Sequence, residues 1–168
     1  MKKALLVIDM QEATVGASHA VFFKYDKELL NRVNSVISSS DAEVVVYIKN
    51  LMKNNFVNKF APAKVFDNTP EAELAKGLKI VSSNIYSKYT GDAFMVSDFC
   101  DFLKNNSVDT VELIGVDGGG CVSLTALGAC KNGYKVILNT TAIGTMFDRR
   151  KEKYFEKLKK LGAIFIKQ

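Results

Sequence analysis

Several short stretches of consecutive apolar residues limit the folds that this chain can adopt. The first, ALLVI at residues 4–8, contains no polar residue, and largely apolar runs follow at 43–48 and 110–114. Such runs are typical of strands that are buried on both faces, as in a parallel sheet covered by helices. We expect strands at 4–8, 43–48, 78–81, 110–114 and 163–166, and a turn and strand at 133–138.

Segments with helical periodicity separate these strands. Leu29, Val33 and Val36 share one helical face, for example. We expect helices at 25–38, 71–76, 96–104, 122–131 and 148–161, with long loops at 12–24, 50–69 and 82–92. Strands that alternate with helices form right-handed βαβ units and a parallel sheet. The predicted fold class is therefore α/β.

The length and composition predict one globular domain over residues 1–168. The 168 residues, 48% of them apolar, suffice for one core and not for two. The net charge is +5, but the densest basic run, residues 149–160, interleaves acidic residues like an amphipathic helix with a solvated basic face. We therefore expect no nucleic-acid partner.

The N-terminus begins like a secretory signal, with two lysines before an apolar run. Asp9 ends that run after five residues, which is too short for a signal peptide. No segment is long enough to span a bilayer, so we expect no membrane partner. The three cysteines are odd in number and form no C-x-x-C pair, which argues against a disulfide framework or a zinc site. A free thiol fits a reducing compartment, and we expect a cytoplasmic protein.

The stretch from Val111 to Thr125 reads as a strand, a glycine turn and a helix that opens at Cys121. A cysteine at a helix N-terminus meets unpaired backbone N–H groups and the positive end of the helix dipole, which favour the reactive thiolate. Two plainer interpretations are a phosphate-binding loop and a buried structural cysteine. The sequence GVDGGG at 115–120 matches neither common phosphate-binding pattern, and we expect Cys121 to be a nucleophile.

Two further reactive residues follow predicted strands. Asp9 comes directly after the first strand, and Lys88 lies in the polar loop 82–92. Taken singly, Asp9 is more often a capping residue, and a loop lysine is usually solvated. Because ligands bind beyond the carboxyl ends of parallel strands, however, both residues and Cys121 are expected at one edge of the sheet. There a carboxylate can accept a thiol proton, and an ammonium lowers the thiol pKa.

Three motifs in order resemble the isochorismatase-like cysteine hydrolase superfamily, which includes nicotinamidases and carbamoylsarcosine amidases. VIDMQ at 7–11 is similar to the family's opening strand and D-x-Q motif. The segment around the family's lysine is similar to KYTGDAF at 88–94, followed by Ser97, Phe99 and Leu103. GVDGGGCVSLTA at 115–126 resembles the family motif G-x-x-T-x-x-C-V-x-x-T-A, and GYKV at 133–136 resembles the segment that follows this motif. Gly118 replaces the motif's threonine, and Gly91 stands where many members have an aromatic residue.

The resemblance implies a three-layer, Rossmann-like α/β/α fold with a six-stranded, mostly parallel sheet. It implies an Asp–Lys–Cys triad of Asp9, Lys88 and Cys121, with Cys121 attacking the carbonyl of a small amide and Asp9 as base. The bond before Asp117 is expected to be cis. The residues expected to bind substrate or the oxyanion are Gln11, Phe94, Asp117, Gly118 and Gly120. A homo-oligomer, dimer or tetramer, is expected.

A metal-dependent nicotinamidase is not expected, because the chain has no D-x-H motif and His19 is its only histidine. We expect no metal and no cofactor. Two other functions stay open. One is a vinyl-ether hydrolase of the isochorismatase type, which depends on Asp9 and forms no thioester. The other is a non-catalytic protein that keeps the fold to bind a small molecule.

Overall fold

The computed structural model describes residues 2–16, 23–60 and 64–167, and within them one six-stranded sheet. Its strands are β1 (Lys3–Ile8), β2 (Val44–Asn50), β3 (Ile85–Lys88), β4 (Thr110–Gly115), β5 (Lys135–Ile143) and β6 (Ile164–Ile166). Their order is β3-β2-β1-β4-β5-β6, and every neighbouring pair is parallel. This is the order of a doubly wound Rossmann-type sheet, in which β1 and β4 flank the point where the winding direction changes.

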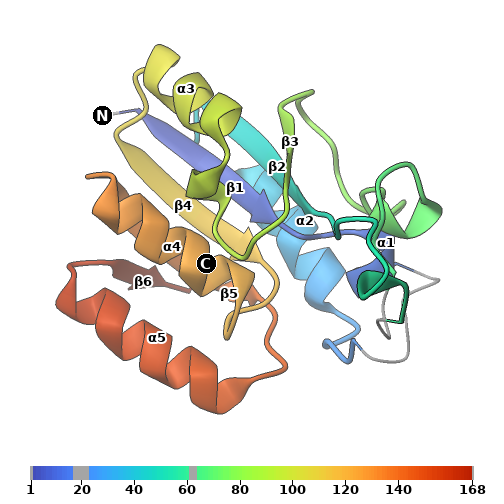
Figure 1. Cartoon of the computed structure of the whole chain (residues 1–168). Coiled ribbons are helices and arrows are strands. Elements are labelled where there is room, and N and C mark those ends of the chain that lie inside the picture. The colour runs from blue at the N-terminus through green and yellow to red at the C-terminus, as the bar shows by residue number, and fades with distance from the viewer. Residues whose placement is uncertain (1, 17–22, 61–63, 168) are drawn as a thin grey trace.

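Helices cover both faces of the sheet (Figure 1). They are α1 (Glu12–Val15), α2 (Leu29–Ser39), α3 (Ser97–Asn105), α4 (Cys121–Lys131) and α5 (Asp148–Lys160), with short 3-10 turns η1 (Asn58–Phe60), η2 (Pro70–Ala72) and η3 (Ala93–Met95). The helices α3, α4 and α5 lie on one face, and α2 lies on the other (Figure 1). The expected three-layer α/β/α architecture is confirmed.

Alternating residues of β1 enter two separate cores, which explains its uninterrupted apolar sequence. Leu6 and Ile8 pack with α3, α4 and α5, whereas Leu5 and Val7 pack with α2. All four side chains are fully buried. A strand at the centre of a doubly covered sheet has no solvent face, so neither side of it needs polar residues.

One expected strand is wrong. Residues 78–81 form no strand, and the edge strand β3 is Ile85–Lys88, within the segment that we expected to be a loop. Residues 79–82 are held beside β2 by side chains instead: the Tyr47 hydroxyl donates to Lys79 O and accepts from Val81 N, and the Ser82 hydroxyl donates to Val45 O. Because an edge strand tolerates polar residues, the sequence IYSK did not stand out as a strand.

Smaller differences concern helix ends. The expected loop 12–24 begins with the single-turn helix α1, the helix expected at 71–76 is only the 3-10 turn η2, and α2 begins at Leu29 and not at Tyr25.

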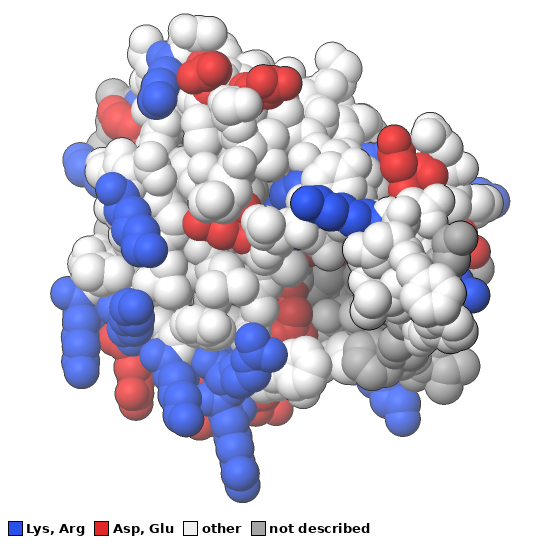
Figure 2. Space-filling view, viewed as in Figure 1, with Lys and Arg blue, Asp and Glu red and all other residues white. Residues whose placement is uncertain are grey.

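Within the described ranges, no helix is both long and apolar enough to cross a membrane. Lys and Arg side chains project along α5, with acidic side chains between them (Figure 2), as the sequence 149–160 indicated.

Candidate active site

Asp9, Lys88 and Cys121 come together at the carboxyl ends of three strands. Asp9 follows β1, Lys88 is the last residue of β3, and Cys121 is the first residue of α4 after β4. Lys88 Nζ donates to Asp9 Oδ2 at 2.9 Å, and Lys88 and Asp9 are 1% and 4% exposed. The charges of both act on the Cys121 thiol. The lysine is thus placed by a strand end and not by a flexible loop.

Asp9 has a backbone conformation that is uncommon for a residue other than glycine. Its φ is 52°, in the left-handed region, which aspartate tolerates better than most residues. The peptide is held by Asp9 N, which donates to Ile48 O at 2.9 Å, and by the Thr14 hydroxyl, which donates to Asp9 O at 2.6 Å. Among the described residues, Asp9 Oδ1 is buried and has no hydrogen-bond partner. One carboxylate oxygen therefore binds Lys88 while the other is left as an acceptor.

The ion pair keeps Lys88 charged despite its burial. Burial is the largest single influence and lowers the pKa of Lys88, but Asp9 and Cys121 together outweigh it, so the pKa is raised. A second oxygen, Asn50 Oδ1, accepts from Lys88 Nζ at 3.1 Å. Sequence reasoning missed Asn50, because no motif of the chain connects it with the lysine.

The protonation state of Cys121 differs from the expectation. We expected the helix N-terminus and Lys88 to favour the thiolate, but burial and then the Asp9 carboxylate raise the pKa of the Cys121 thiol to about 12. Lys88 opposes these two effects only in part. At neutral pH the site therefore holds a thiol beside a carboxylate–ammonium pair.

The glycine turn before Cys121 uses most of its own amides. Gly118 N donates to Gly144 O at 2.8 Å, Gly119 N to Asp117 Oδ1 at 2.6 Å, and Gly120 N to Asp117 O at 2.9 Å. Within the part of the chain that the structure describes, the amides of Asp117 and Cys121 have no acceptor. These two N–H groups are thus the donors of the turn that a ligand can use. The bond between Val116 and Asp117 is cis, as the resemblance implied.

The Asp117 side chain joins three segments around the turn. Besides Gly119 N, it accepts from Met146 N at 2.6 Å and from the Tyr25 hydroxyl. Burial, and then the Asp117, Asp9 and Cys121 charges, raise the pKa of Tyr25, which places this phenol at the triad. Tyr25 is a site residue that sequence reasoning missed, because nothing in its neighbourhood distinguishes it from a core tyrosine.

Gly118 lies against a hydroxyl from the segment after β5. A Cβ at residue 118 would overlap Thr145 Oγ1. Thr145 Oγ1 is buried, and no hydrogen-bond partner for it lies in the described ranges. The Thr145 hydroxyl therefore fills the space where the side chain of the motif's usual threonine would begin.

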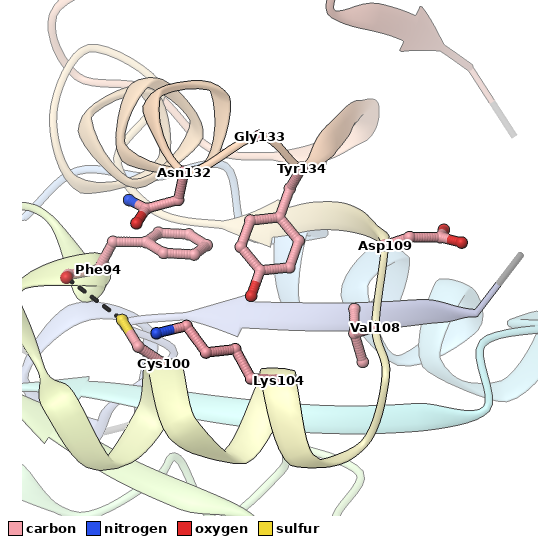
Figure 3. Close-up of a pocket in the computed structure, with 8 residues that line it drawn as sticks. All are labelled: Phe94, Cys100, Lys104, Val108, Asp109, Asn132, Gly133 and Tyr134. Carbon is pink, nitrogen blue, oxygen red and sulfur yellow. Dashed lines mark hydrogen bonds between the residues drawn. The ribbon is translucent and has the colours of Figure 1, made fainter.

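Gln11 and Phe94, two of the expected substrate contacts, are engaged elsewhere. Gln11 is 1% exposed, and its side-chain amide bonds to the backbone of Asn50 and Ala72. The Phe94 ring packs against Phe99 and Tyr134, with centroids 5.3 Å away in both cases. It lines a pocket of about 280 Å³ between α3 and the end of α4 (Figure 3). Of the described residues that line this pocket, none belongs to the triad. Substrate contact by Gln11 or Phe94 stays a prediction.

Comparison with known proteins identifies the family. Residues 3–168 match the model of the isochorismatase domain. The chain belongs to the isochorismatase family. The proteins of this family are hydrolases, and this isochorismatase-family protein is one of them. Among curated protein sequences, none matches it.

Solved structures share the fold of this isochorismatase-family hydrolase. PnC1 from L. infantum, in complex with nicotinate, is 22% identical over 99% of this chain and 92% of its own, with a TM-score of 0.86. Pyrazinamidase of Pyrococcus horikoshii, in complex with zinc, is 24% identical over 100% of both chains, with a TM-score of 0.85. N-carbamoylsarcosine amidase from Thermoplasma acidophilum is 23% identical over 99% and 96%, with a TM-score of 0.78.

The described residues of this isochorismatase-family protein do not fit a transition-metal site. In the ranges 2–16, 23–60 and 64–167, no three His, Cys, Asp or Glu side chains cluster as ligands would. The side-chain oxygen of Asn50, at the end of β2, is not a free ligand, because it accepts a hydrogen bond from Lys88. His19 lies outside the described residues. The expected absence of metal and cofactor stays a prediction.

Proposed function

We propose that this hydrolase cleaves the C–N bond of a small amide through a thioester on Cys121. The observation that carries the proposal is the buried Asp9–Lys88 ion pair, whose charges act on the Cys121 thiol, with Asp9 Oδ1 left as an acceptor. Such a carboxylate can remove the thiol proton as the sulfur attacks, so that no thiolate has to exist beforehand. Because the pKa of Cys121 is raised, the proposed attack uses a base, and Asp9 is the group placed to act as one.

In the acylation step, Asp9 acts first as a base and then as an acid. As Asp9 takes the thiol proton, the Cys121 sulfur forms a bond to the carbonyl carbon, and the carbonyl oxygen becomes an oxyanion. The free amides of Asp117 and Cys121 are the proposed donors to that oxyanion, a role worth about 3 kcal/mol per donor. When the intermediate collapses, the C–N bond breaks and Asp9 returns the proton to the leaving nitrogen.

Deacylation repeats the proton transfer with water. Asp9 removes a proton from a water molecule, whose oxygen attacks the thioester carbon. The C–S bond then breaks, the thiol regains the proton from Asp9, and a carboxylic acid leaves. Lys88 stays positively charged throughout and offsets the negative charge that appears on the sulfur and on Asp9 in turn.

The test is ammonia release from nicotinamide, pyrazinamide and N-carbamoylsarcosine, which the names of the similar structures suggest. We expect turnover of at least one small amide, and its loss in Cys121→Ala and in Asp9→Asn. Mass spectrometry after rapid quenching should show an acyl group on Cys121. No ammonia from any amide, together with hydrolysis of a vinyl ether that is retained in Cys121→Ala, would favour the vinyl-ether type of chemistry. Binding without any turnover would favour a non-catalytic role.

The remaining proposals concern assembly and location. We propose that residues 1–168 act as a single cytoplasmic domain that takes a small-molecule substrate, needs no metal or other cofactor and assembles as a homo-oligomer. Light scattering coupled to size exclusion measures the oligomeric state directly. A chelator added during the ammonia assay tests the metal, because a metal-dependent enzyme would lose activity and regain it with zinc.

A further inference from the structure

Lys88 is held by two oxygen atoms, and only one of them belongs to the proposed triad. Its Nζ donates to Asp9 Oδ2 at 2.9 Å and to Asn50 Oδ1 at 3.1 Å. Since Lys88 is 1% exposed, its N–H groups have to find acceptors inside the protein. Asn50 supplies the second acceptor, and the ammonium is thereby fixed from two directions.

The sheet itself brings Asn50 to the lysine. Asn50 is the last residue of β2 and pairs in register with Lys88, the last residue of β3. In paired strands, residues in register point to the same face, so the two side chains are neighbours. Their contact therefore follows from the strand pairing.

Gln11 fixes Asn50 in turn. The Gln11 side chain accepts from Asn50 N at 2.7 Å and donates to Asn50 O at 3.2 Å. Its amide nitrogen also donates to Ala72 O at 2.9 Å. A fully buried glutamine whose amide clamps both backbone groups of one residue leaves that residue little freedom. The contacts form a chain from Gln11 through Asn50 to Lys88.

The chemistry of an amide also suits this position better than a carboxylate would. Asp9 and Lys88 already balance each other's charge. A second carboxylate beside the lysine would add negative charge near a thiol that is difficult to ionise and so would hinder its deprotonation. A carboxamide oxygen accepts the same hydrogen bond without that charge.

We propose that Asn50 is a positioning residue of this site. Its neutral side-chain oxygen orients the Lys88 ammonium between Asp9 and Cys121, and Gln11 holds Asn50 in place. The inference rests on the proposed function, in which Lys88 offsets the charge that develops on Cys121 and Asp9.

The test compares Asn50→Ala, Asn50→Asp and the control Asn34→Ala. Asn34 lies in α2 and also makes two side-chain hydrogen bonds, to Gly77 O and Lys79 N, outside the site. We expect Asn50→Ala to lower kcat by about tenfold to a hundredfold with KM changed less than about threefold, because a small misplacement of a charged group mainly affects the transition state. Asn34→Ala should leave both constants unchanged.

A second measurement needs no substrate. The rate at which iodoacetamide labels Cys121 is followed against pH in each variant. Asn50→Asp keeps the shape and the acceptor but adds a charge, and we expect its labelling profile to move up by about one pH unit, which slows labelling tenfold at pH 8. Asn50→Ala should also slow labelling, since the ammonium is no longer held beside the sulfur.

The outcomes separate the inference from the proposed reaction. Wild-type kcat and a wild-type labelling profile in Asn50→Ala would overturn the positioning role, and an unchanged profile in Asn50→Asp would overturn the need for a neutral group. If the native protein hydrolyses no amide, the proposed reaction is wrong, while the labelling profiles still decide the role of Asn50. Circular dichroism and urea unfolding establish that each variant is folded before it is compared.

Discussion

At the scale of single residues, the buried Asp9–Lys88 pair and the Cys121 thiol differ in charge. Lys88 and Asp9 stay an ion pair because each compensates the other, whereas Cys121 has no full counter-charge of its own and keeps its proton. In the proposed reaction, Cys121 therefore depends on Asp9 to remove its proton during the attack and not on a low resting pKa.

The pH dependence of labelling tests this protonation state. At pH values below a pKa of about 12, the thiolate fraction rises about tenfold with each unit of increase in pH. We therefore expect the rate of Cys121 alkylation by iodoacetamide to rise steadily from pH 7 to pH 10. Peptide mapping after timed exposure at each pH measures that rate. Burial raises the pKa of Cys100 and Cys130 as well, so they serve as internal references. A plateau reached near neutral pH would contradict the thiol assignment and support the thiolate expected from the sequence.

Removing the lysine should cost stability as well as activity. Lys88→Met leaves the buried Asp9 carboxylate without its counter-ion, and we expect a loss of about 3–5 kcal/mol in the free energy of unfolding at pH 7. Asp9→Asn in the same chain should recover much of this loss, because asparagine is neutral and tolerates the left-handed backbone. Urea unfolding of the two single variants and the double variant measures the coupling. Additive losses would show that the pair contributes little.

At the scale of elements, the site depends on how closely α4 packs against η3. A Cβ at Gly128 in α4 would overlap the Asp92 carboxylate, which accepts from Phe94 N at 2.9 Å at the start of η3. The segment that carries Lys88 at its beginning is thus held against the helix that begins with Cys121. Glycine is required there for the close approach, although it is a poor helix former.

Gly128→Ala sets two effects against each other. Helix propensity alone would stabilise the protein by about 1 kcal/mol, whereas an overlap in a packed interior costs about 1–3 kcal/mol. We expect the overlap to dominate, with a net loss of stability in thermal or urea unfolding. Asp92→Ala in the same chain should make Gly128→Ala less harmful. A gain of stability in the single variant would mean that η3 moves away at little cost.

The elements that could be predicted from the sequence are those with one dominant local signal. The uninterrupted apolar run of β1 and the glycine turn before Cys121 belong to this class. The strand β3 was missed because its polar residues suit an edge, and the neighbouring Ile80 and Val81 suggested a strand instead. Tyr25 and Asn50 could not be found, because their contacts join distant segments and no local pattern encodes them.

At the scale of the whole molecule, the sheet order puts the site beside its most protected strand. β1 lies at the centre of the order, paired with both β2 and β4, and five of its six residues are buried. The strand β6 lies at an edge, and Ile164 is 56% exposed. Asp9 therefore follows the part of the fold that opens least often.

Hydrogen exchange should reproduce this ordering. We expect the amides of β1 to exchange most slowly, close to the rate of global unfolding, and those of β6 to exchange much faster. Mass spectrometry of peptides after timed exchange at neutral pH measures both. Equal protection of β6 and β1 would contradict the prediction and indicate that another surface covers the edge, such as a second copy of the chain.

The contact between Gly118 and Thr145 also constrains how this sequence can have changed over evolutionary time. Because a side chain at 118 and the Thr145 hydroxyl claim the same space, the two positions cannot drift independently. In this chain, a side chain at 118 would require the Thr145 hydroxyl to rotate away or to be lost. A search that demands the threonine would therefore overlook relatives in which that space is filled from the segment after β5.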